Sequence, residues 1–250
     1  MSNIKYSIIC CYYNEIGLLK NKFNLLLDEI KNLPFSFELF VCDNNSNDGS
    51  REFLKDQENK KIQNINFVYN EKNLGKGGSI KKCIDLSNGE FIVIFDIDEY
   101  LIRDLIKADN FLKNDDQIMF LVGSRIINQK KFIYKKNYYG VRIMSMLINF
   151  LFKTKVSDAA GATKIFKKNI YDKFKYSTNG FDFEFEVLCK FAKNGFKVSE
   201  FPIEYHPRSF EEGKKLRAFK DGFYILKTIV KSYLIKWVIK IFLSLVDLVY

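Results

Sequence analysis

Two aspartates directly follow an apolar run in the stretch GEFIVIFDIDEYL, residues 89–101. Residues 91–95 are all apolar, whereas Asp96, Asp98 and Glu99 are acidic. Burying an unpaired carboxylate costs several kcal/mol, so a buried strand that ends in acids requires a positive partner. In an extended chain residues i and i+2 point to the same side, so Asp96 and Asp98 can address one ligand.

A pair of carboxylates at a strand end suits a hard divalent cation. Mg²⁺ and Mn²⁺ prefer oxygen ligands and accept further oxygens from the phosphates of a substrate. A D-x-D pattern alone is weak, because it often only caps a loop. Since this one ends an apolar strand, we predict that Asp96 and Asp98 bind Mg²⁺ or Mn²⁺.

The surrounding sequence alternates short apolar strands with amphipathic helices. The predicted strands of the first half are residues 6–11, 37–42, 65–69 and 91–96. The helices between them are predicted after Asn14-Glu15, at 51–57 and at 79–86. This order indicates an α/β fold whose parallel strands bind ligands at their carboxyl ends. Asn14-Glu15, Asp43 and the D-x-D pair therefore gather on one rim.

The second half continues the alternation less regularly. Helices are predicted at residues 101–112 and 182–193, and strands at 118–123, 164–166 and 198–203. From about residue 219 the chain is predicted to be helical, and its last part is apolar but carries Lys236, Lys240 and Asp247. Charges within that stretch disfavour a membrane span and favour a helix lying on the membrane surface. A helix packed on its own domain, or on a second subunit in a homo-oligomer, is the alternative.

The 250 residues carry a net charge of +10. Residues 125–156 hold eight basic residues and no acid. Such a block suits an anionic membrane surface, a phosphorylated ligand or nucleic acid, or it forms an ordinary solvated face. The block therefore leaves the partner open.

Several other classes of protein are disfavoured. The stretch GKGGS lacks the G-x-x-x-x-G-K-[ST] spacing of a P-loop, and no G-x-G-x-x-G follows the first strand. The five cysteines show no C-x-x-C spacing, so we interpret them as buried thiols rather than disulfides or metal ligands. The N-terminus lacks the pattern of a signal peptide, which predicts a cytoplasmic protein.

An ordered set of motifs resembles the inverting family 2 glycosyltransferases of the GT-A fold. In the first half these motifs are YNE at 13–15, DNNSNDGS at 43–50, N-x-G-K-G at 73–77 and DID at 96–98. In the second half they are GSR at 123–125, R-x-x-S-x-x-x-N at 142–149, D-x-x-x-G/A-x-K at 158–164, FDFEFEVL at 181–188 and HPRSFEEGKKL at 206–216. The later motifs resemble the branch of dolichyl- and polyprenyl-phosphate sugar synthases. The resemblance covers residues 5–222, and Cys11 replaces a common proline.

The resemblance implies roles for matching residues on the donor side. Tyr13 and Glu15 flank the nucleotide, Asp43 hydrogen-bonds the base, Asp96 contacts the ribose or the metal, and Asp98 binds the metal. A cation there neutralises charge on the departing nucleoside diphosphate. Lys76, in a glycine-rich turn at a helix start, suits the same anionic ligand, and the turn serving backbone geometry alone is the alternative. Arg208 and Lys214 would close over the diphosphate as a lid, whereas His206 is interpreted as structural.

Two kinds of acceptor remain open on the other side of the site. Asp158 matches the family's candidate catalytic base, which a hydroxyl acceptor needs. A lipid phosphate is already anionic and needs binding instead, for which the forked guanidinium groups of Arg125 and Arg142 are suited. Glu184 and Glu186 share one face if their stretch is extended, which makes one of them a candidate for shaping the acceptor pocket. Salt bridging is the structural alternative for both glutamates, and a helix cap is the alternative for Asp158.

We therefore predict a metal-dependent, inverting hexosyltransferase. Its glycosyltransferase domain is residues 1–218, with a nucleotide-sugar half at 1–124 and an acceptor half at 125–218, followed by a helical segment at 219–250. The predicted donor is a UDP- or GDP-linked sugar, and the predicted acceptor is a polyprenyl phosphate at the inner face of the cell membrane, with no nucleic-acid partner. A glycan hydroxyl as acceptor is the alternative, and a noncatalytic nucleotide-binding module is a third hypothesis.

Overall fold

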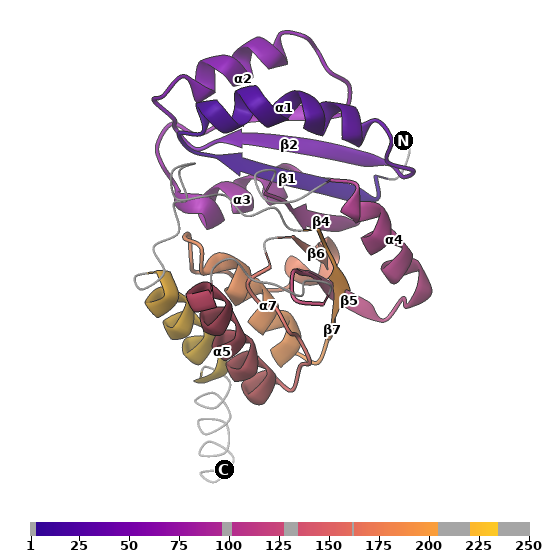
Figure 1. Ribbon diagram of the computed structural model, residues 1–250, viewed down its shortest axis with the longest axis vertical. Helices are drawn as coiled ribbons and strands as arrows, with labels where there is room; N and C mark the ends of the chain where they lie inside the picture. The colour runs from indigo at the N-terminus through magenta and orange to yellow at the C-terminus, as the bar shows by residue number, and fades with distance from the viewer. Residues whose placement is uncertain (1–3, 97–101, 128–134, 162, 205–220, 235–250) are drawn as a thin grey trace, which may run out of the picture.

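A mixed seven-stranded sheet forms the centre of the computed structural model, which describes residues 4–96, 102–127, 135–161, 163–204 and 221–234 (Figure 1). The strands are β1 (Tyr6–Tyr12), β2 (Phe37–Asp43), β3 (Ile65–Tyr69), β4 (Phe91–Ile94), β5 (Ile118–Ser124), β6 (Lys164–Lys167) and β7 (Lys197–Pro202). Their order across the sheet is β3-β2-β1-β4-β6-β5-β7. Strand β6 runs antiparallel to β4 and β5, and all other neighbours are parallel.

Helices cover both faces of this sheet. They are α1 (Ile16–Ile30), α2 (Ser50–Glu58), α3 (Gly75–Leu86), α4 (Asp104–Asn114), α5 (Lys135–Phe152), α6 (Lys168–Tyr171) and α7 (Phe183–Lys193). One hydrophobic core joins α1, α2 and α4 to one face of the sheet. The second core joins α3, α5, α7 and the helical residues 221–234 to the other face. Burial on both faces explains why the central strands β1, β2 and β4 consist mostly of apolar residues.

The reversed direction of β6 places its amino end at a functional rim. The carboxyl ends of β1, β2, β4 and β5 lie at one edge of the sheet because these strands run in the same direction. In the β4–β6 ladder Ile94 pairs with Lys164, so β6 begins where β4 ends. Residues that precede β6 therefore reach the same rim as residues that follow β4 and β5.

The structure confirms the predicted α/β class and most element positions, with four differences, one of which is the unpredicted short helix α6. Helix α3 begins at Gly75 rather than Ser79, so the glycine-rich turn is helical. Helix α4 begins at Asp104 rather than at residue 101. Helix α5 occupies most of the basic block but was not predicted, because both its buried and its exposed faces carry large apolar side chains, for example Ile148 and Phe150.

The C-terminal segment is helical over residues 221–234, as predicted, and residues 235–250 lie outside the described part. Ile225 and Ile229 of this helix are buried in the second core. Among the described residues, no helix combines the length and the hydropathy needed to cross a bilayer.

Glu186 of α7 holds the chain that leads into this helix. Its carboxylate accepts hydrogen bonds from the backbone N–H groups of Ser177 and Thr178, at 3.0 and 2.9 Å, and from Lys190 Nζ at 2.8 Å. Burial acts to raise the pKa of Glu186, but the hydrogen bonds from Lys190 and Thr178 outweigh it and lower the pKa to about 2. The ionised carboxylate therefore stabilises the native state.

We expect the substitution Glu186→Gln to lower the free energy of unfolding at pH 7 by about 1–3 kcal/mol, because an amide cannot accept all of these bonds. Since the folded-state pKa is depressed from 4.5 to about 2, the carboxylate's contribution is complete above pH 4.5 and disappears as the pH falls through 2. Urea unfolding between pH 7 and pH 3 measures this difference between variant and wild type. The exposed Glu52→Gln on α2 is the control, and a gap of equal size at all pH values would contradict the assignment.

Candidate active site

The sequence predicted a set of site residues, and those that the structure describes lie at the rim formed by the strand ends. Tyr13 and Glu15 follow β1, Asp43 ends β2, Asp96 follows β4, and Arg125 follows β5. Lys76 lies in the first turn of α3, Arg142 lies in α5, and Asp158 lies in the loop that leads into β6. Four residues with predicted roles lie outside the described part: Asp98, His206, Arg208 and Lys214. The metal-binding role of Asp98, the structural role of His206 and the lid role of Arg208 and Lys214 therefore remain predictions.

Hydrogen bonds join the loops that follow β1 and β2. The side-chain oxygen of Asn14 accepts from the backbone N–H of Asn47 at 2.9 Å, while the N–H of Asn14 donates to Ser46 Oγ at 2.9 Å. The N–H of Glu15 donates to Ser50 Oγ at 2.9 Å. Asn14 has a φ of +52°, a left-handed conformation that asparagine tolerates better than most residues. The YNE and DNNSNDGS motifs therefore build one unit.

Asp43 is fully buried and its charge is compensated. Arg51 Nε donates to Asp43 Oδ2 at 2.7 Å, and the backbone N–H groups of Asn45 and Ser46 donate to the same carboxylate at 3.1 and 3.2 Å. The guanidinium of Arg51 also lies over the ring of Tyr69, 5.7 Å from its centroid. These contacts fix the orientation of Asp43 within its own loop.

A chain of alternating charges connects the two halves of the site. Lys76 Nζ lies 2.6 Å from Asp96 Oδ2 and 2.8 Å from Glu184 Oε1, and Glu184 Oε2 lies 2.9 Å from Lys164 Nζ. Lys164 Nζ also donates to the carbonyl oxygen of Gly161 at 2.5 Å. Lys76 therefore supplies the positive partner that Asp96 requires in this structure.

The pKa shifts in this chain keep its lysine and glutamate charged. Burial acts to lower the pKa of Lys76, but the carboxylates of Asp96 and Glu184 hold the pKa well above its usual value. Burial acts to raise the pKa of Glu184, but Lys164 and Lys76 lower it overall. Lys76 and Glu184 are thus held in their charged forms by the neighbouring opposite charges.

Glycines allow α3 to approach the loop before α7. Gly75 has a φ of +76°, and a Cβ at this position would collide with the carbonyl oxygen of Asn179. A Cβ at Gly77 would collide with the Cβ of Phe183, next to Glu184. The glycines of the N-x-G-K-G motif therefore position Lys76 against Glu184 by allowing close packing.

Arg125 and Asp158 form a bidentate pair in the part of the site that the sequence assigns to the acceptor. Arg125 Nε and Nη2 each donate to one oxygen of Asp158 at 2.7 Å, and the backbone N–H of Arg125 donates at 3.0 Å. The Asp158 side chain is fully buried. Both oxygens of the predicted base are therefore engaged by a single arginine.

Helix α5 supports the loop that carries Asp158. Ser145 Oγ accepts from the N–H of Ala159 at 2.9 Å, and Asn149 bonds both the N–H and the carbonyl of Val156 at 2.9 Å. Arg142 Nη1 donates to the carbonyl oxygen of Ser157 at 3.4 Å. The R-x-x-S-x-x-x-N spacing thus presents three side chains from one helix face to the same loop.

The sequence profile of Glycosyl transferase family 2 matches residues 7–174, which include both the donor rim and the Asp158 loop. The chain belongs to this family. The match confirms the family predicted from the motifs, and with it the assignment of the chain as a glycosyltransferase.

Curated relatives are glycosyltransferases of low identity. Dolichyl-phosphate beta-glucosyltransferase of Dictyostelium discoideum is 24% identical over 249 residues, covering 92% of this chain and 74% of the relative. Glycosyltransferase AglD of Haloferax volcanii is 20% identical over 220 residues and 83% of this chain. The chain spans 34% of AglD and 51% of the hexosyltransferase Agl6 from the same organism.

Solved structures confirm the GT-A architecture. A Pyrobaculum calidifontis mannosyltransferase, in complex with GDP-Man and Mn²⁺, matches with a TM-score of 0.58 and 22% identity, covering 79% of this chain and 55% of that protein. The glucosyl-3-phosphoglycerate synthase of Mycobacterium tuberculosis, in complex with Mn²⁺, UDP and phosphoglyceric acid, gives a TM-score of 0.65 at 13% identity, covering 92% and 79%. At these identities the likeness concerns the fold.

Two residues of this family 2 site carried weak or no signals in the sequence. Arg51 lies just after the DNNSNDGS motif, and nothing in its spacing pointed to Asp43. Lys164 ends the D-x-x-x-G/A-x-K motif, but its pairing with Glu184 depends on the meeting of β6 and α7. Glu184 and Glu186 both form salt bridges, as the structural alternative predicted.

We expect Gly77→Ala to lower the free energy of unfolding by about 1–3 kcal/mol, because the added methyl group overpacks the contact with Phe183. Gly17→Ala is the matched control: a Cβ at Gly17, in helix α1, meets nothing within 4 Å. The control is expected to raise the free energy of unfolding by about 0.4–1 kcal/mol. Thermal or urea unfolding measures both, and equal effects of the two substitutions would contradict the packing role.

Proposed function

We propose that this chain transfers a hexose from a UDP- or GDP-linked sugar to a polyprenyl phosphate, with inversion at the anomeric carbon. An oxygen of the acceptor phosphate forms the new bond to that carbon as the nucleoside diphosphate leaves. Family membership supports the glycosyl transfer, and the dolichyl-phosphate relative supports a lipid phosphate as acceptor. The solved neighbours that hold GDP-Man or UDP support a nucleotide-sugar donor.

The observation that carries the choice of acceptor is the pairing of Asp158 with Arg125. A hydroxyl acceptor loses a proton during transfer and needs an available base. Both oxygens of Asp158 accept hydrogen bonds from Arg125, so Asp158 must break a hydrogen bond to Arg125 before it can accept a proton. A phosphate monoester, with a second pKa of about 6, is already largely anionic at neutral pH and needs no base. The pairing therefore favours the phosphate acceptor.

Two arginines next to this loop suit the binding of that phosphate. Arg125 and Arg142 both bond the dipeptide Ser157-Asp158. Guanidinium groups match phosphate oxygens in geometry as well as in charge. In this proposal Asp158 holds the guanidinium of Arg125 in the orientation that binds the acceptor phosphate. Arg142 binds the same phosphate from α5.

On the donor side the chain holds the nucleotide and the diphosphate. Tyr13 and Glu15 flank the nucleotide and Asp43 hydrogen-bonds its base, in a frame made rigid by the joined loops. The carboxylate of Asp96 offers hard oxygens and fits Mg²⁺ or Mn²⁺, with Asp98 as its proposed companion. When bound, the cation supplies charge neutralisation for the leaving diphosphate. Lys76, which contacts Asp96, adds a second positive charge, and Arg208 with Lys214 would complete the enclosure.

An exposed apolar stripe on α5 supports action at a membrane surface. Tyr139, Ile143, Met146 and Phe150 follow each other at intervals of four, three and four residues, and are 62–82% exposed. Helix α5 and the helical residues 221–234 lie side by side (Figure 1), joined by a contact between Phe152 and Tyr233. A helix with such a stripe and no acidic residue suits an anionic lipid surface.

The same helix connects this surface to the acceptor side of the site. Arg142, Ser145 and Asn149 bond the loop of Asp158, while the apolar stripe points away from the protein. A lipid whose tail stays in the membrane thereby brings its phosphate near Arg142 and Arg125. This placement supports a membrane-borne acceptor.

Product formation from a panel of UDP- and GDP-sugars, with a short polyprenyl phosphate offered beside a glycan acceptor, tests the function. We expect Mn²⁺- or Mg²⁺-dependent transfer to the lipid phosphate, and a loss of roughly a thousandfold or more in Asp98→Asn. Asp116→Asn, an exposed acid before β5, is expected to match wild type.

Transfer to the glycan alone would overturn the choice of acceptor. Wild-type turnover by Asp98→Asn would overturn the metal assignment. If neither UDP nor GDP bound more tightly with Mn²⁺ present, the donor site itself would be misassigned.

Replacing Ile143 and Met146 together by aspartate is expected to weaken binding to anionic phospholipid vesicles by at least about tenfold, because two apolar contacts become charged. Co-sedimentation with the vesicles measures the bound fraction. Leu25→Asp provides the control, since Leu25 is 50% exposed on α1, which packs on the other face of the sheet. Equal losses in both variants, or none in either, would argue against α5 as the membrane contact.

A further inference from the structure

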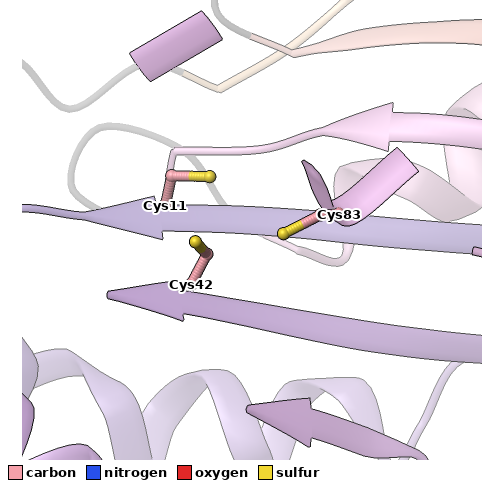
Figure 2. Close-up of side chains that lie close together, drawn as sticks. All are labelled: Cys11, Cys42 and Cys83. Carbon is pink, nitrogen blue, oxygen red and sulfur yellow. The ribbon is translucent and has the colours of Figure 1, made fainter. Parts of the chain in front are cut away.

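Three cysteines from three elements converge one layer beneath the donor rim. Cys11 of β1, Cys42 of β2 and Cys83 of α3 have sulfur atoms that all lie within 4.8 Å of one another (Figure 2). Cys11 and Cys42 are register partners in neighbouring parallel strands, so their side chains leave the same face of the sheet. Along the chain, Cys42 lies 31 residues after Cys11, and Cys83 lies 41 residues after Cys42. This spacing gave no indication in the sequence that the three cysteines share a site.

The cluster is enclosed by protein but not sealed from solvent. Cys42 and Cys83 are fully buried, whereas Cys11 is partly exposed and forms the solvent side of the cluster. Asn70 Nδ2 lies 3.7 Å from Cys42 Sγ and 2.9 Å from Ser79 Oγ. A polar donor therefore lies beside the buried sulfur of Cys42. A thiol that only fills space in a hydrophobic core has apolar neighbours instead.

A positive charge lies near the cluster. Lys82 Nζ donates to Asn70 Oδ1 at 3.0 Å, and Asn70 in turn contacts the sulfur of Cys42. Cysteine binds metal ions as the thiolate, and a nearby cation stabilises that form.

We propose that Cys11, Cys42 and Cys83 form a binding site for a thiophilic metal ion, Cu⁺ or Zn²⁺. Three sulfur ligands at a metal–sulfur distance of about 2.3 Å lie roughly 4 Å from each other, so the observed cluster needs only a small contraction. Sulfur ligands select soft ions over Mg²⁺ and Mn²⁺, so this site differs in chemistry from the donor cation's site. Three-coordinate sulfur suits Cu⁺, and Zn²⁺ takes water or the Ser79 hydroxyl as a fourth ligand.

Binding at this site links the elements that carry the donor residues. Cys11 and Cys42 each lie within two residues of a predicted nucleotide-binding residue, Tyr13 and Asp43. Cys83 lies seven residues, about two helical turns, after Lys76 on α3. Formation of the three metal–sulfur bonds releases the thiol protons to solvent and needs no oxidant or reductant. The bound ion ties β1, β2 and α3 together beneath the rim.

Anaerobic titration of the reduced, metal-free full chain with Cd²⁺, a spectroscopic stand-in for Zn²⁺, tests the proposal. We expect a thiolate-to-metal absorption band that saturates at one Cd²⁺ per chain, is lost when the thiophilic Cu⁺ displaces Cd²⁺, and is unchanged by excess Mn²⁺. Cys42→Ser is expected to weaken binding by at least about a hundredfold. Cys189→Ser, an equally buried thiol on α7, is expected to bind as wild type does.

A second measurement uses the wild-type chain alone and does not depend on the folding of a variant. One equivalent of Cd²⁺ is expected to protect Cys11, Cys42 and Cys83 from alkylation, as identified by mass spectrometry of peptides. Absence of the band, an equal loss of affinity in Cys189→Ser, or no protection of the three thiols would overturn the proposal. All of these outcomes are independent of glycosyl transfer.

Discussion

The ion chain Asp96–Lys76–Glu184–Lys164 is the interaction on which the arrangement of the site depends. A carboxylate at the end of a buried strand destabilises the fold unless a positive group is held beside it. Lys76 reaches Asp96 from α3, and Glu184 and Lys164 continue the alternation into α7 and β6. Because each charge has a partner on another element, the network fixes α3, α7, β4 and β6 around one point. It also joins the first half of the chain, which carries Lys76 and Asp96, to the second half, which carries Lys164 and Glu184.

The packing around this network follows from small residues and from strand direction. Gly75 and Gly77 bring α3 close enough to the loop before α7 for Lys76 to contact Glu184. The reversal of β6 carries Lys164 and the preceding Asp158 loop to the edge where β4 and β5 end. Under the proposed function, a cation bound to Asp96 would compete with Lys76 for the carboxylate, which would couple metal binding to the position of the lysine. Arg125 and Asp158 form a second, separate ion pair on the acceptor side.

Much of the fold and part of the site were predictable from local patterns. Strand β3 has the predicted bounds, and most other elements differ from prediction by one or two residues, because buried parallel strands are marked by continuous apolar runs. Helix α5 escaped prediction since apolar residues on its exposed face hide the helical periodicity. The meeting of Cys11, Cys42 and Cys83 was not predictable, because these residues lie on elements whose neighbourhood only the tertiary structure defines. The pairing of Arg51 with Asp43 was not predictable either, because it depends on the path of the loop between β2 and α2.

The sequence by itself determined the family, the α/β class and the residues available for chemistry, because ordered motifs and short-range periodicity are local properties of the chain. The tertiary structure decided which of those residues have partners. It paired Asp96 with Lys76, engaged both oxygens of Asp158 with Arg125, and turned three isolated cysteines into a cluster. The physical reason is that ion pairs and ligand sets act over a few ångströms in space, whereas the residues that form them lie 20 to 72 positions apart along the chain.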